Sequence, residues 1–125
     1  MRLLLDTHAL LWWLASDPAL DPNARAAIAD EDSFVAVSAA SAWEIAIKRA
    51  LGRLDAPDDL DAQLDAHQFA DVPVTVVHAL RAGALPSLHT DLFDRILVAQ
   101  AQVEGLTIVT RDENIPRYDV ATLRA

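Results

Sequence analysis

The sequence lacks several features that mark common classes of protein. It contains no cysteine, which excludes disulfide bonds and thiolate metal sites and fits a protein of the cytoplasm. Its three glycines leave no glycine-rich loop for binding phosphate groups. No apolar stretch approaches the roughly 18 residues that a membrane-spanning helix needs, and Asp6 breaks the first apolar run too early for a signal peptide. We therefore expect a cytoplasmic protein that does not enter a membrane.

Basic residues are scarce as well. Lysine and arginine number 10 against 19 aspartates and glutamates, so the formal net charge is −9. This excess of negative charge opposes nucleic-acid binding unless bound cations or a local basic strip reverse it. Lys48, Arg49 and Arg53 are close enough in sequence to form such a strip. The alternative is that these cations only favour the C-terminal end of a helix.

Short apolar runs alternate along the chain with longer segments of helical pattern. With 53% hydrophobic residues, residues 1–125 suffice for a single domain with one full core. Strands are predicted at residues 2–5, 33–37, 106–110 and 120–123, with a strand or an extended connection at 72–76. Helices are predicted at residues 7–15, 22–30, 57–69, 77–85 and 92–104, and a further helix begins after Ser38 or Ser41 and ends at Gly52. This alternation favours an α/β fold with parallel strand pairing.

Four acidic residues lie where these elements meet. Asp6 ends the first strand, Glu44 lies early in the helix after the second, and Asp94 lies in the first turn of the helix at 92–104. Asp112 follows the strand at 106–110. In open parallel sheets ligands bind outside the carboxyl ends of the strands, so these carboxylates can meet at one edge. They would repel one another unless a hard cation such as Mg²⁺ or Mn²⁺ neutralised them. The pattern indicates a metal-dependent site for phosphodiester chemistry.

Asp6 and Glu44 also have simpler interpretations. Asp6 can act as the N-cap of the helix that follows it, and we weigh cap and ligand equally. Glu44 can form an exposed i,i+4 ion pair with Lys48. Its apolar neighbours Trp43, Ile45 and Ile47 instead predict that this part of the helix is largely buried, which favours a functional role for Glu44.

The acids in the C-terminal half have comparable alternatives. Asp91 is predicted mainly as an N-cap, and Asp94 would in any case be favourable near a helix N-terminus. Because Asp94 interrupts an otherwise apolar helix face, we favour a functional role for it. Asp112 lies in a composition that is common in turns. Each acid is weak evidence alone, whereas all four at these structural positions are strong evidence.

Four segments of the chain resemble the sequence motifs of one known family. They are Leu3–Trp12, Ser38–Lys48, His89–Ala101 and Ile108–Asp112, and each contains one of the four acids. Together they resemble a PIN domain, specifically a VapC-type toxin of a bacterial toxin–antitoxin pair. Leu92 stands where this subfamily often has proline, a departure of little consequence because a helix can begin without proline.

The resemblance implies a fold and a function. The fold would be a three-layer α/β/α sandwich with a short, mostly parallel central sheet. The activity would be that of a Mg²⁺- or Mn²⁺-dependent endoribonuclease, with the four acids as catalytic and metal-binding residues. Its partners would be RNA, a cognate antitoxin that blocks the site, and a second copy in a homodimer. DNA would be contacted only indirectly, through the antitoxin.

Further residues receive supporting roles in this interpretation. Three residues behind the ligands are expected to steady the four acids or a metal-bound water, namely Ser41, Asp91 and Thr110. Contact with RNA phosphate, or neutralisation of the acids, is assigned to Arg95 and Arg111. The roles of ligand or proton carrier stay open for His8 and His89, whereas His67 and His78 are expected to be structural.

Two other readings of the chain stay open. In the first, the protein is a non-catalytic PIN-like interaction module whose acids are caps and solvated charges, and Leu11 and Trp12 form its partner surface. In the second, Asp6 is the nucleophile of a phosphatase. A haloacid-dehalogenase-type motif would need an aspartate where His8 stands, and the adjacent acid pair of response-regulator receivers is absent.

Overall fold

The computed structural model describes all 125 residues of the chain. Five strands form, namely β1 (Arg2–Leu5), β2 (Phe34–Ser38), β3 (Ala70–Val72), β4 (Thr107–Thr110) and β5 (Thr122–Arg124). Six α-helices accompany them, namely α1 (Thr7–Leu14), α2 (Pro22–Ala29), α3 (Ala39–Ala50), α4 (Leu60–Ala66), α5 (Val76–Ala84) and α6 (Leu92–Glu104). One 3₁₀ turn, η1, spans Ile115–Arg117. None of the helices combines the length and the hydrophobicity required to cross a bilayer.

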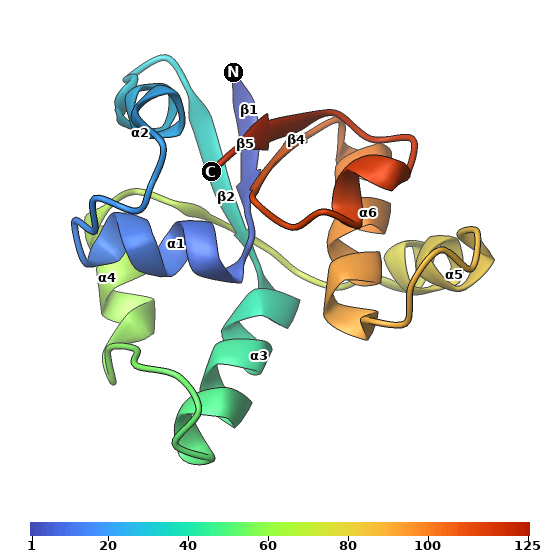
Figure 1. The fold of residues 1–125 in the computed structure, drawn as a ribbon, viewed down its shortest axis with the longest axis horizontal. Helices are drawn as coiled ribbons and strands as arrows, with labels where there is room; N and C mark the ends of the chain where they lie inside the picture. Colours follow the sequence, from blue (N-terminus) through green and yellow to red (C-terminus); the bar gives the residue numbers. More distant parts are fainter.

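The strands form one sheet in the order β3-β2-β1-β4-β5, and every pairing is parallel. The expected α/β fold is confirmed, and the sheet is parallel throughout where the sequence predicted a mostly parallel one. The first strand of the chain lies at the centre, with Leu4 paired to Ala36 on one side and Ile108 on the other. All carboxyl ends therefore face the same edge, where α1, α3 and the start of α6 gather (Figure 1).

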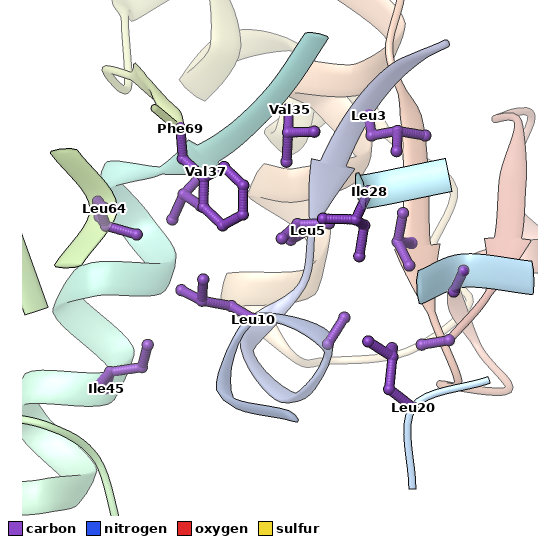
Figure 2. Packing of buried hydrophobic residues seen from close by; sticks show 14 residues of the cluster. Leu3, Leu5, Leu10, Leu20, Ile28, Val35, Val37, Ile45, Leu64 and Phe69 are labelled. Atoms are coloured by element: carbon purple, nitrogen blue, oxygen red, sulfur yellow. The ribbon is translucent and has the colours of Figure 1, made fainter. Parts of the chain in front are cut away.

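Helices cover both faces of the sheet, which gives the predicted three layers (Figure 1). Alternate residues of a strand point to opposite faces, so Leu3 and Leu5 join one buried cluster and Leu4 joins the other. The first cluster packs the sheet against α1, α2, α3 and α4 (Figure 2). The second packs it against α6 and η1, and α5 lies outside against α6. The apolar run of β1 is thus buried on both sides.

The boundaries differ from the prediction mainly around the short third strand. Strand β3 ends at Val72, whereas the sequence pattern placed a strand or extended segment at 72–76. Pro73 follows immediately, and it has no N–H with which to continue the ladder. Thr75 then caps α5 in a capping box with His78, so the apolar residues after it belong to a helix. His78 is almost fully buried there, as expected for a structural histidine.

Candidate active site

Asp6 lies between the central strand and the first helix, and the fold holds it from several directions. Its backbone N–H donates to the carbonyl of Val109 at 3.1 Å, which continues the pairing with β4. Its carboxylate caps α1, because Oδ1 accepts from the N–H of Ala9 at 2.9 Å. The other oxygen, Oδ2, accepts from the Thr110 hydroxyl at 2.5 Å. The cap predicted for Asp6 and its position at the strand end are therefore both present in one residue.

Glu44 reaches the same edge of the sheet from α3. It is 8% exposed, and its Oε1 accepts a short hydrogen bond from the Thr7 hydroxyl of α1. Its Oε2 accepts from Lys48 Nζ at 2.9 Å, so the predicted i,i+4 pair also forms. The reason given for its burial holds only in part: Ile45 is buried, but Trp43 is 64% exposed and Ile47 is 38% exposed. The contact of α3 with Thr7 of α1 also covers this carboxylate.

Asp94 lies in the first turn of α6, above the N-cap of that helix. Asp91 provides the cap, accepting the N–H of Asp94 at 3.1 Å, as the sequence predicted. The side chain of Asp94 is turned toward His89, whose Nε2 lies 3.2 Å from Oδ2. The other ring nitrogen of His89 lies 2.7 Å from the Tyr118 hydroxyl. His89 therefore holds the Asp94 carboxylate in place.

Asp112 follows β4 and closes the site on the C-terminal side. Its carboxylate accepts from the N–H groups of Asn114 at 2.7 Å and Ile115 at 3.2 Å. Its own N–H donates to the hydroxyl of Thr110 at 3.0 Å, the hydroxyl that also serves Asp6. The turn predicted for this acidic segment is therefore real, and one threonine joins two of the four acids.

All four acids line a single depression, here called the acidic cleft, with a volume of about 340 Å³. Only one of its side chains is hydrophobic. Its lining residues are Asp6, Thr7, His8, Trp12, Glu44, Lys48, Asp91, Asp94, Arg111 and Asp112. No three histidine or acidic side chains converge on one point that could hold an ion. The predicted gathering of the acids at one edge is thus present, while their sharing of one ion stays a prediction.

Comparison with known proteins identifies the family of this chain. A sequence model of the PIN domain matches residues 3–121. The chain belongs to the PIN domain family. This PIN domain is also 33% identical over 115 residues to the ribonuclease VapC22 of Mycobacterium tuberculosis, covering 90% of its own length and 88% of that protein.

Solved structures share the fold. This PIN domain superimposes on a chain of VapBC2 from Rickettsia felis, solved with a promoter DNA fragment, with a TM-score of 0.73 and 15% identity over 98% of both chains. A toxin–antitoxin complex from Klebsiella pneumoniae gives a TM-score of 0.69 at 19% identity, covering 97% of this chain and 95% of the other. FitAcB of Neisseria gonorrhoeae gives 0.65 at 20% identity, covering 98% and 96%. At such identities the agreement concerns the architecture alone.

The acids of this PIN domain carry more negative charge than their surroundings accommodate. Burial, together with the neighbouring charges of Asp91 and Asp112, raises the pKa of Asp94 to about 7. Burial also raises the pKa of Asp6, while the hydrogen bond from Thr110 works in the opposite direction. Two buried carboxylates with raised pKa values, Asp6 and Asp94, in one cleft form an arrangement that a cation would stabilise. The donor set consists of carboxylate oxygens, which Mg²⁺ and Mn²⁺ prefer, so these residues fit such an ion chemically.

The two arginines assigned to RNA have different positions. Arg111 lines the cleft, with its guanidinium over the Trp12 ring at 4.5 Å from the centroid. Its donors contact the carbonyls of Ala19 and Ala125. Arg95 is absent from the cleft lining. Its guanidinium instead donates to the Tyr118 hydroxyl and to three carbonyls, that of Ala82 in the last turn of α5 and those of Leu85 and Pro86 just after it.

Of the two hydroxyls that were expected to support the acids, only that of Thr110 contacts one. Thr110 bonds directly to Asp6, as the sequence interpretation proposed. The hydroxyl of Ser41 is buried and has no hydrogen-bond partner, so the expected bond from Ser41 to an acid is not formed. Thr7 takes that part instead, through its bond to Glu44. No spacing rule pointed to Thr7, because its partner lies on a different helix.

Trp13 and His67 make structural contacts with each other, whereas His8 and Trp12 line the cleft. Trp13 donates from its indole N–H to His67 at 3.3 Å, and His67 stacks on Phe69. Trp12 faces the cleft beneath Arg111. The segment from Leu11 to Leu14 is half-buried, so Leu11 and Trp12 do not form the exposed partner surface that the interaction-module reading needs.

Proposed function

We propose that this PIN domain, a single domain over residues 1–125, is a metal-dependent endoribonuclease that acts as the toxin of a toxin–antitoxin pair. The observation that carries the proposal is the meeting of four acids from four separate sequence motifs in one polar cleft. The 33% identity to a protein named as a ribonuclease supports the activity. The likeness to chains from toxin–antitoxin complexes supports the biological role.

In this proposal Asp6, Glu44, Asp94 and Asp112 hold one or two Mg²⁺ or Mn²⁺ ions. A bound ion supplies Lewis acidity toward the phosphate and makes water easier to deprotonate. The chain supplies the orientation, because hydrogen bonds from Thr7, Thr110 and His89 hold the carboxylates of Glu44, Asp6 and Asp94.

Within this site we assign proton acceptance to Glu44. Its Oε2 is bonded only to Lys48 and so can take a proton from the water whose oxygen forms the new bond to phosphorus, while the bond from phosphorus to the leaving oxygen breaks and that oxygen takes a proton from solvent.

The acids are tested by substitutions that conserve shape. Asp6→Asn and Asp94→Asn should abolish metal-dependent cleavage of RNA while circular dichroism stays that of the wild type. Asp55→Asn is the matched control, since Asp55 is exposed, lies outside the cleft and changes the net charge by the same amount. Cleavage by either site variant at the wild-type rate would show that the assigned role is wrong.

Metal binding separates this proposal from the interaction module. Calorimetric titration with Mn²⁺ should give saturable heat with the wild-type protein and none beyond nonspecific binding with Asp94→Asn. Added EDTA should stop cleavage, and Mg²⁺ or Mn²⁺ should restore it. Equal, unsaturable heat from both proteins would favour the non-catalytic module.

The partners follow from the same proposal. We propose a cytoplasmic protein that forms a homodimer and binds a cognate antitoxin, with DNA contacted only through that antitoxin. Two helices expose apolar side chains that an interface would cover: Trp43 on α3 with Leu51 just after it, and Val77 and Leu80 on α5. Sedimentation analysis should show a dimer for the wild type and a monomer for Leu80→Glu. A monomeric wild-type protein at micromolar concentration would contradict the homodimer.

A further inference from the structure

Lys48 lines the acidic cleft with an ammonium group whose hydrogen-bond donors are only partly used. Lys48 lies one turn after Glu44 on α3, and its Nζ donates to Glu44 Oε2 at 2.9 Å. That is its one recorded hydrogen bond, so two of the three ammonium donors are unused. The Lys48 side chain is 43% exposed, against 10% for Glu44. The ammonium therefore stands at the open side of the cleft, with donors directed to whatever enters it.

The two arginines near the cleft, Arg111 and Arg95, are held by more hydrogen bonds than Lys48. Arg111, the second lysine or arginine of the lining, places its Nε and one terminal nitrogen on the carbonyls of Ala19 and Ala125. Arg95 is held by three carbonyls and the Tyr118 hydroxyl. The second terminal nitrogen of Arg111 has no hydrogen bond, but its guanidinium is fixed by these bonds and by the Trp12 ring beneath it. Lys48, with a single hydrogen bond, is therefore the less constrained of the two cleft cations.

RNA must bring its phosphates into a cleft lined by five carboxylates. Repulsion by these groups opposes binding of a polyanion, and a lysine at the rim lowers that repulsion where the backbone enters. Lysine is a compact charge with rotatable donors on a flexible stem. These properties suit a phosphate oxygen whose position differs from one RNA to another, since a phosphate contact carries no sequence information.

We propose that Lys48 binds a backbone phosphate of the RNA that enters the acidic cleft, an inference that rests on the proposed function. Its bond to Glu44 holds the ammonium in position before RNA arrives. The competing explanation is that Lys48 serves only as the counterion that fixes Glu44, with no contact to substrate. The two explanations differ in what happens to the salt dependence of RNA binding.

The experiment measures RNA binding in the Asp94→Asn background, so that cleavage does not interfere. A short fluorescein-labelled RNA of mixed sequence is titrated with protein in Mg²⁺ buffer at several concentrations of KCl. Lys48→Met is compared with Lys48→Arg and with Arg49→Met. Arg49→Met is the matched control, because it removes one positive charge from the neighbouring residue. The Nε of Arg49 contacts the carbonyl of Ala56, and Arg49 does not line the cleft.

Loss of one phosphate contact lowers the slope of log K against log salt by about 0.7 for a single strand. Lys48→Met should show that decrease, Lys48→Arg should restore the slope, and Arg49→Met should leave it unchanged. An unchanged slope in Lys48→Met overturns the proposal, as does an equal decrease in Arg49→Met, which would indicate a diffuse basic strip. An unaltered slope, together with weaker Mn²⁺ binding by Lys48→Met in the protein that retains Asp94, would show the counterion role alone.

Two controls keep the result interpretable. Thermal unfolding establishes that each variant is folded, and Lys48→Gln replaces Lys48→Met if the methionine variant is not. Failure of the proposed function is detected separately, because a wild-type protein that leaves RNA intact in Mg²⁺ or Mn²⁺ refutes the nuclease without reference to Lys48. In that case, a change of slope in Lys48→Met would still show that Lys48 contacts an RNA phosphate.

Discussion

Asp94→Asn should stabilise the metal-free protein at neutral and alkaline pH. The pKa of Asp94 is raised from 3.8 to about 7, first by burial and then by Asp91 and Asp112. Each unit corresponds to about 1.4 kcal/mol, so a fully buried group would cost about 4 kcal/mol to ionise. The side chain is 19% exposed and water screens part of the effect, which reduces the expected cost to about 2 kcal/mol.

The sign of the pH dependence follows from linkage. Because the folded-state pKa of Asp94 lies above the unfolded-state value, the native protein binds the proton more tightly. This contribution to stability is fully present below about pH 4 and is lost as the pH rises through about 7. Asparagine does not ionise, so the variant escapes the loss. The difference in unfolding free energy should be near zero at pH 4 and about 2 kcal/mol in favour of Asp94→Asn at pH 8.

Urea unfolding in EDTA, followed by circular dichroism at several pH values, measures this difference. For a chain of this size about 2 kcal/mol corresponds to a rise in Tm of about 7 °C. Asp55→Asn controls for the change in net charge, and Mg²⁺ should stabilise the wild type but not Asp94→Asn. A difference that is the same at pH 4 and pH 8, or a variant less stable than the wild type at pH 8, would refute the reasoning.

Three further substitutions test the packing around the site by urea unfolding. Thr110→Val removes the hydroxyl donor of the buried Asp6 and should cost about 2 kcal/mol, whereas Thr110→Ser should cost less; equal losses would point to the methyl group instead. Arg95→Met leaves three carbonyls without their donor and should lower the free energy of unfolding by about 2 kcal/mol. An unchanged urea midpoint would mean that these hydrogen bonds do not stabilise the fold. Leu10→Ala opens a cavity in the fully buried cluster and should cost about 3 kcal/mol; a loss below about 1 kcal/mol would contradict the burial.

The sequence was sufficient for the architecture because the signals were local and consistent. The run before Asp6 is short and wholly apolar, and the structure buries it on both faces at the centre of the sheet. Gly105 ends α6 in the left-handed conformation that glycine adopts most easily. The four acids could be placed at one edge because parallel pairing puts all strand ends on the same side.

Contacts between distant elements were beyond the reach of sequence patterns. The exposure of Trp43 depends on which side of α3 faces α1, and periodicity alone does not give that rotation. The hydrogen bonds of Arg95 to carbonyls at the end of α5 and just after it depend on the path of the chain between two helices. The bond between Thr7 and Glu44 joins residues 37 positions apart. Such tertiary contacts determine which candidate side chains actually face the cleft.

The double attachment of Asp6 has a practical consequence for anyone preparing an inert form of this protein. Because its carboxylate ends the first helix as well as facing the cleft, alanine there would remove about 1 kcal/mol of helix stability together with the charge. A loss of RNA cleavage could then come from misfolding rather than from lost chemistry. Asparagine retains an oxygen for the Ala9 amide, so it is the replacement expected to give an inactive but folded protein.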